Sequence, residues 1–134
     1  MNRKGFTLLE VLIVVIIIGV LATLGLANYQ IVIENTHDKK AQSNLKLIRN
    51  AERIYRMEQG VYAPCPTILV VNNILKLAIP NPSVSTDAPW LYSVTVTNPT
   101  SAFSSKAVRN VTDSRRRAWC VDQNPDIEPY VCSP

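Results

Sequence analysis

The first half of the chain shows two successive patterns of apolar and polar residues. Residues 6–27 (FTLLEVLIVVIIIGVLATLGLA) are apolar almost throughout, and Glu10 is the one charged residue among them. As a helix, a run of this length rises about 33 Å, which is enough to cross the hydrocarbon core of a membrane. Residues 28–59 are amphipathic instead. Together the two patterns predict one helix over residues 6–59, apolar in its first half and packed against a small domain in its second.

The amphipathic stretch places apolar and basic residues on different faces of this helix, at steps of three and four. The apolar face, expected to join a core, consists of Ala41, Leu45, Leu47, Ile48, Ala51, Ile54 and Tyr55. The basic face, expected to be solvated, consists of Lys46, Arg49, Arg53 and Arg56. Glu52 is spaced to form surface ion pairs with Arg49 and Arg56. Gly60 is expected to end the helix.

Beyond Gly60 the composition shifts to Pro, Asn, Ser, Thr and Val. Residues 67–79 are ambiguous between a strand and a short helix. Strands are expected at 90–96, 103–111 and 118–121, and Pro125, Pro129 and Pro134 predict an irregular tail. These lengths fit a small antiparallel sheet of three or four strands against the helix, which is an α+β fold.

Three interpretations fit the apolar run and the basic residues in front of it. Arg3 and Lys4 precede the run, so the positive-inside rule places the N-terminus in the cytoplasm and the rest of the chain outside. The run could be a signal anchor that holds a periplasmic domain. It could be a secretory signal that is cut after Ala27, where a small-x-small site ends. In the third interpretation, a leader is cut between Gly5 and Phe6.

The residues KGFTLLEVLIVV, which begin at Lys4, strongly resemble the processing signal of type IV prepilins and type II secretion pseudopilins. The resemblance implies that residues 1–5 are a leader, which prepilin peptidase removes by cutting between Gly5 and Phe6, and that the new amine of Phe6 is methylated. It implies that residues 6–27 are a transmembrane and polymerisation helix. Residues 28–134 then hold the amphipathic helix and a small globular β domain.

Glu10 acquires a role from this resemblance. A carboxylate in a membrane helix costs roughly 2.5–3.5 kcal/mol at the helix centre, and a charge placed there is expected to have a partner. In the family, the glutamate of each subunit pairs with the N-terminal amine of a neighbour. Opposite charges attract strongly at low dielectric, so a subunit leaves the bilayer for the filament more easily in the register that neutralises both.

The resemblance also implies a lollipop-shaped subunit with a C-terminal loop closed by a disulfide. That implication favours Cys120–Cys132 over a pairing with Cys65. The proline that the family often carries near the end of the apolar run is replaced here by Ala27. The implied partners are other copies of the chain in a homopolymer filament, prepilin peptidase, an inner-membrane assembly platform with its ATPase, and the membrane before assembly. The implied location is the inner membrane, single-pass with a periplasmic C-terminal domain, and afterwards a periplasmic or extracellular filament.

The function expected from the sequence is therefore that of a structural subunit of a type IV pilus-like filament. One alternative is a pseudopilin of a type II secretion system, which acts as a periplasmic piston. A second is a membrane-tethered binding domain that does not polymerise, and a third is a secreted protein released after Ala27.

The net charge, the chain length and the cysteine count each limit these interpretations. The net charge of +4 falls to about +2 without the two cations Arg3 and Lys4, which is too mild an excess to indicate nucleic acid as a partner. The 134 residues fit one small domain with an appendage. Three cysteines allow three single disulfides, each leaving one thiol, and a disulfide suits an exported chain.

Catalytic and cofactor motifs are absent from the sequence. There is no zinc-type Cys/His spacing, no phosphate-binding glycine loop and no serine nucleophile motif, so we expect neither enzyme activity nor a cofactor. The single histidine, His37, is most simply a polar helix residue. Asp122, Asp126 and Glu128 could chelate calcium, but their spacing matches no calcium loop, and a solvated acidic tail without metal is favoured. The basic run at 115–117 is expected to be solvated, with phosphate or an acidic neighbour as the alternative.

Overall fold

The structure is a computed structural model that describes residues 5–81, 89–111 and 117–134, and within residues 24–28 it describes only the backbone. These residues belong to two compact units, which divide between Thr36 and His37. Arg3, Lys4 and most of the basic run at 115–117 lie outside the described residues.

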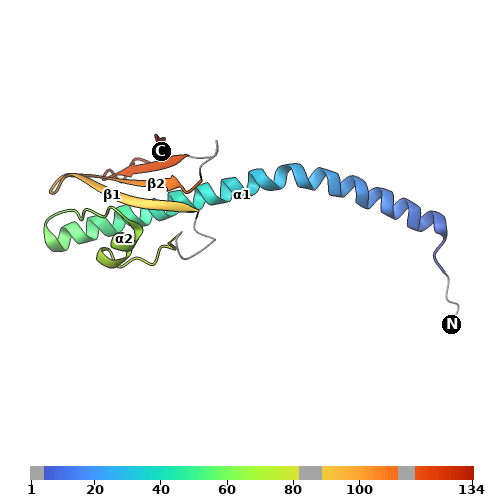
Figure 1. The fold of residues 1–134 in the computed structure, drawn as a ribbon, viewed down its shortest axis with the longest axis horizontal. Helices are drawn as coiled ribbons and strands as arrows, with labels where there is room; N and C mark the ends of the chain where they lie inside the picture. Colours follow the sequence, from blue (N-terminus) through green and yellow to red (C-terminus); the bar gives the residue numbers. More distant parts are fainter. Residues whose placement is uncertain (1–4, 82–88, 112–116) are drawn as a thin grey trace. The chain divides into compact units, whose positions relative to one another are not determined.

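Helix α1 spans Leu8–Gln59 and confirms the predicted long helix (Figure 1). It begins two residues later than predicted because Thr7 caps it: the amide of Glu10 donates to the Thr7 hydroxyl at 3.3 Å and to the Thr7 carbonyl at 3.1 Å. Gly60 ends the helix as predicted. Its φ of 79° is a left-handed conformation that glycine adopts without strain, and its amide donates to the Arg56 carbonyl at 2.8 Å.

The first unit contains the N-terminal part of α1 and the residues before it. Its large apolar side chains are exposed along the whole described stretch from Phe6 to Leu21. The backbone stays helical through Gly19 and Gly25. Within the residues that the structure describes, no helix combines the length and the apolar character needed to cross a membrane.

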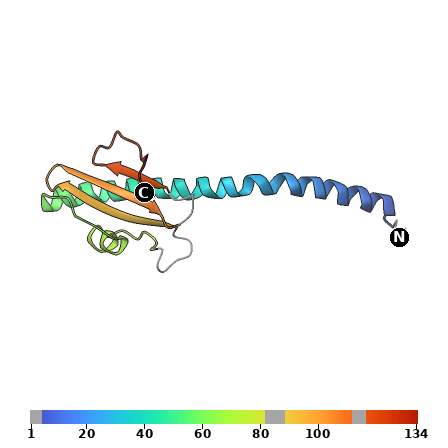
Figure 2. The ribbon, with the colours of Figure 1, turned by 45° about the horizontal axis from the view of Figure 1, so that its top comes forward.

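The second unit carries a four-stranded antiparallel sheet in the order β1-β2-β3-β4 (Figure 2). The strands are β1 (Trp90–Asn98), β2 (Ala102–Arg109), β3 (Ala118–Asp122) and β4 (Tyr130–Cys132). The first three confirm the predicted strands to within two residues at each end. β4 corrects the prediction of an irregular tail. Pro129 and Pro134 lie outside β4, so neither interrupts its pairing with β3.

Helix α2 (Ile68–Ile74) settles the ambiguity at residues 67–79 in favour of a short helix. Ile68 and Val71 point into the core, and α2 packs against β1. The side chain of Asn72 fixes the segment that follows, because its Nδ2 donates to the Ile79 carbonyl at 2.8 Å and its Oδ1 accepts from the Ile79 amide at 3.1 Å. These two bonds fix the chain that leads away from α2.

The core face of α1 is narrower than the sequence predicts. The buried side chains on α1 are those of Ala41, Leu45, Ile48, Arg49 and Glu52. Leu47 and Ile54 are 50% and 53% exposed, so the prediction that they join the core is wrong. The sheet meets α1 on the side of Ile48, and Leu47 lies about 100° round the helix from it. Arg49 and Glu52, predicted to be solvated, take part in the core instead.

Candidate functional site

The expected cleavage site lies in front of α1 and outside any regular element. A Cβ placed on Gly5 would meet no atom within 4 Å, and Phe6 is 78% exposed. The helix begins only after the Thr7 cap. The bond between Gly5 and Phe6 is therefore in an exposed, non-helical segment, which is the kind of backbone that a protease can bind.

Glu10 lies in the first turn of α1, where the helix dipole favours a negative charge, and its side chain is exposed. The residues on either side, Leu9 and Val11, are exposed and apolar. No side chain among the described residues pairs with the Glu10 carboxylate. The acid is thus presented outward from an apolar helix surface, in a position from which it can reach another chain.

At the other end of the chain, a disulfide joins the last two strands. Cys120 on β3 and Cys132 on β4 are bonded, with their Cα atoms 5.9 Å apart, and Cys65 is a buried free thiol. The bond encloses the segment between β3 and β4, residues 123–129, which we call the C-terminal loop.

Arg49 holds the C-terminal loop against α1. Its Nη1 donates to the carbonyl of Asn124 at 2.9 Å and to the carbonyl of Ile127 at 2.7 Å, and the residue is only 6% exposed. Lys46, one turn earlier, forms an ion pair with Glu128 of the same loop. A hydrogen bond from Lys46 lowers the pKa of Glu128 below its usual value. Sequence reasoning missed this role, because basic residues at helical spacing look the same whether they are solvated or turned toward a loop.

Of the acids considered for calcium, Asp122 and Glu128 have carboxylates that are engaged in other ways. Asp122 accepts the amide of Asn124 at 2.9 Å, and the side chain of Asn124 accepts the amide of Asp126 at 3.0 Å. Glu128 pairs with Lys46. Across the described residues, no group of three or more His, Cys, Asp or Glu side chains is arranged to hold a metal ion.

We predict that Arg49→Met lowers the free energy of unfolding by about 3 kcal/mol. Hydrogen bonds from a charged donor contribute roughly 1.5–3 kcal/mol each, and here two carbonyls lose their shared donor. Urea unfolding of the full chain in detergent micelles, followed by tryptophan fluorescence, measures the loss. Lys46→Met is the matched control, with a much smaller effect because its ion pair is solvated. Equal losses in the two variants would contradict the role of Arg49.

Glu52 is a fully buried carboxylate near the end of α1. Its Oε2 accepts the amide of Ala63 at 2.9 Å, and its Oε1 lies 4.0 Å from Sγ of Cys65. Burial raises the pKa of Glu52 to about 7, against the lowering effect of the Ala63 hydrogen bond. Burial, with the charge of Glu52 added, raises the pKa of the Cys65 thiol to about 12. Glu52 therefore ties the segment after Gly60 to the helix, in place of the predicted surface ion pairs.

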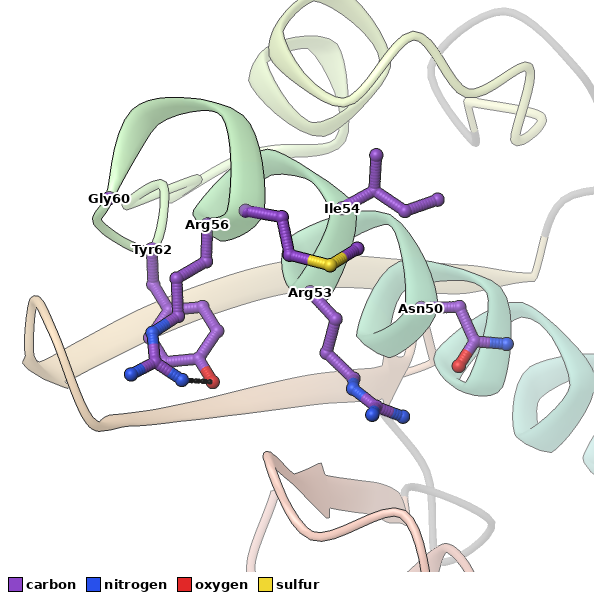
Figure 3. Close-up of a pocket in the computed structure, with 7 residues that line it drawn as sticks. Asn50, Arg53, Ile54, Arg56, Gly60 and Tyr62 are labelled. Carbon is purple, nitrogen blue, oxygen red and sulfur yellow. Dashed lines mark hydrogen bonds between the residues drawn. The ribbon is translucent and has the colours of Figure 1, made fainter.

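An open hollow lies beside the end of α1, lined by Asn50, Arg53, Ile54, Arg56, Met57, Gly60 and Tyr62 (Figure 3). Arg56 donates to the hydroxyl of Tyr62 at 3.3 Å, and its guanidinium lies 5.1 Å from the centre of the tyrosine ring. Arg53 extends from the same helix without a contact to the other side chains drawn there. The hollow has a positive, partly apolar lining.

The structure also shows where two further candidate residues from the sequence lie. His37 is half-buried on α1, as a polar helix residue would be. Arg117 is the one member of the basic run at 115–117 that lies within the described residues, and its Nε is 3.0 Å from the Asp38 carboxylate. That part of the run thus joins the residue just before β3 to α1.

Comparisons with known proteins point to the N-terminal region. Residues 1–26 match the family model described as the prokaryotic N-terminal methylation motif. The chain is 38% identical over 61 residues to the type II secretion system core protein G of Escherichia coli (strain K12), which is 46% of this chain and 42% of that protein. It is 35% identical over 62 residues to the type IV major pilin protein PilA of Myxococcus xanthus (strain DK1622), 46% of this chain and 28% of that one.

A longer match is to the core protein G of Klebsiella michiganensis, 30% identical over 89 residues, which is 66% of this chain and 58% of that protein. The chain spans less than half of the core proteins G from Escherichia coli and Aeromonas hydrophila, at 42% and 43% of their lengths. No solved structure matches the chain.

Proposed function

We propose a structural role for this chain, from the premise that it carries the N-terminal methylation motif and is similar to type IV pilins and type II secretion pseudopilins. The chain is made as a membrane-anchored precursor, cut by prepilin peptidase between Gly5 and Phe6, methylated on Phe6 and polymerised through residues 6–27. The observation that carries the proposal is Glu10, an exposed acid four residues after Phe6 on an otherwise apolar helix surface.

The geometry of the first unit supports this order of events. The bond between Gly5 and Phe6 lies in an exposed segment, so it is accessible before the helix packs on anything. Cleavage leaves a charged amine on Phe6 at the start of an apolar helix. The carboxylate of Glu10 on another copy neutralises that amine, and apolar side chains on both copies lose their contact with lipid or water together.

We infer the location from the same residues. The uncharged stretch after Glu10 anchors the precursor in the inner membrane as a single pass, and the second unit lies in the periplasm, where the Cys120–Cys132 disulfide persists. The partners are further copies of the chain, the peptidase, and an assembly platform with its ATPase. The chemistry belongs to those partners, and the chain itself is not an enzyme.

Two kinds of filament fit this subunit. The first is a type IV pilus-like surface filament. The second is the short periplasmic pseudopilus of a type II secretion system, and the similarity to core proteins G of that system is the observation in its favour. Filaments that extend from the cell surface would support the first, and periplasmic filaments that form only with the secretion machinery would support the second.

Intact mass measurement of the chain from membranes that contain prepilin peptidase tests the processing step. We predict a species that lacks Met1 to Gly5 and carries one added methyl group. In the absence of the peptidase we expect the full-length precursor. Cleavage after Ala27 would instead support a secreted protein, and an uncut chain in the presence of the peptidase would support a tethered domain that does not polymerise.

A further inference from the structure

The outward side of α1 in the second unit carries apolar side chains that its core leaves exposed. Leu47, Ile54 and Met57 are 50%, 53% and 78% exposed. They lie along two neighbouring hollows that share Asn50 and Ile54, one beside Arg53 and the other beside the end of α2. We call Leu47, Arg53, Ile54 and Met57 the α1 outer surface. Large apolar side chains that are exposed next to one another are typical of a surface that another protein covers.

Arg53 gives the α1 outer surface a positive charge, and the charges of Glu58 and Lys76 in the second hollow offset each other. Arg49 is buried on the C-terminal loop, and Arg56 is held by Tyr62. Arg53 is exposed, and among the described residues its guanidinium has no partner (Figure 3). A cation beside exposed apolar residues fits an acid that is itself flanked by apolar side chains.

The C-terminal loop, which Arg49 holds against α1 one turn before Arg53, offers such an acid. Asp126, Ile127, Tyr130 and Val131 form what we call the C-terminal edge, on the C-terminal loop and on β4, the last strand of the sheet. Ile127, Tyr130 and Val131 are 40%, 45% and 66% exposed. The carboxylate of Asp126 is exposed and meets no partner within the part of the chain that the structure describes, whereas Glu128 is paired with Lys46.

We propose that the α1 outer surface of one copy binds the C-terminal edge of another copy, with Arg53 opposite Asp126. This inference rests on the proposed function, since it assigns a second contact to the filament that Glu10 starts. The two surfaces belong to different elements of one unit and have opposite charges and matching apolar residues. Contacts between two different surfaces of identical chains propagate into an open filament when the rotation between neighbouring copies does not close into a ring.

A charge exchange in the full-length chain tests the contact in cells that assemble it. Arg53→Glu places two acids opposite each other, and Asp126→Arg places two cations, so each variant should lower the yield of sheared filaments about tenfold or more. The double variant Arg53→Glu/Asp126→Arg restores opposite charges and should recover most of the yield. Lys106→Glu, a matched charge reversal on the half-exposed face of β2, should assemble like the wild type.

A covalent test uses Ile54→Cys together with Ile127→Cys. Cys65 is buried and the other two cysteines are bonded, so the introduced thiols are the accessible ones. Oxidation of filaments should give a ladder of multimers, because each chain then offers one thiol to each neighbour. Either single variant should give no ladder.

The outcomes separate this inference from the proposed function. If the wild type forms no filament at all, the proposed function fails, and this contact fails with it. If Glu10→Leu abolishes filaments while both charge reversals assemble normally and the double cysteine variant gives no ladder, the proposed function stands and this contact is wrong. Cross-linking of position 54 to a different protein would also overturn it.

Discussion

Replacing Glu10 with leucine should leave membrane insertion intact and abolish filament assembly. Leucine is favoured in a membrane helix, so the precursor inserts at least as well as the wild type. In the filament, however, the amine of Phe6 on the neighbouring chain loses its partner. Removing one member of a buried ion pair costs roughly 3–5 kcal/mol, because the remaining charge stays desolvated. A cost of this size at every contact is enough to prevent polymerisation.

The measurement is the amount of sheared filament relative to membrane-inserted subunit, with processing checked by intact mass. Lys39→Leu is the control, since it replaces an exposed charge with leucine on α1 in the second unit, away from both proposed contacts, and should assemble normally. Glu10→Gln separates charge from size, and we expect it to fail as well. Wild-type amounts of filament from Glu10→Leu would refute the pairing mechanism.

The second large effect is a fall in folding stability with rising pH, which we assign to Glu52. With its pKa raised to about 7, the folded chain keeps a proton on Glu52 that the unfolded chain has already released above its ordinary value of 4.5. The folded state therefore binds more protons between these values, and stability falls as pH rises through this window and then levels off. The shift corresponds to a loss on the order of 3 kcal/mol between about pH 4.5 and about pH 7.

Glu52→Gln should remove this pH dependence. A glutamine side chain is neutral and can still accept the amide of Ala63, so the variant should be as stable as the protonated wild type throughout and more stable than the wild type above neutral pH. Arg49 and Arg56 are the charged groups a turn away on α1, and the Cys65 thiol beside Glu52 titrates far above this range. Urea unfolding of the full chain in detergent micelles at about pH 5 and about pH 8 measures the effect. Glu58→Gln serves as the exposed control, and an unchanged slope in Glu52→Gln would assign the pH dependence to other groups.

The long helix and the first three strands could be predicted because their signals are local. The continuous apolar run and the three-to-four spacing after it define α1, and alternating β-formers such as those of β1 define strands. β4 could not be predicted, since three residues between prolines carry no pattern of their own. Its place depends on pairing with β3, which lies on the far side of a loop.

Some residues of the candidate site could likewise be predicted from the sequence, and others could not. Gly5, Phe6 and Glu10 form a short motif within one segment, so the sequence alone marks them. Arg49 and Glu52 acquire their roles from atoms that are distant in the chain, at Ile127 in one case and at Ala63 in the other. Helical periodicity places both on a polar side, and it cannot say that a loop and a turn will cover that side.

The length of β4 has a consequence for the proposed filament, in which each chain would be concentrated among its own copies. A sheet edge exposes unpaired amides and carbonyls, and edges at high local concentration tend to join into continuous sheets. The β1 edge is blocked by the segment around Cys65, which bonds Val94 in both directions. The other edge is only three residues long, with Pro129 just before it and Pro134 two residues after it. The sheet is thereby guarded at both edges against cross-β aggregation, so that association is left to side chains.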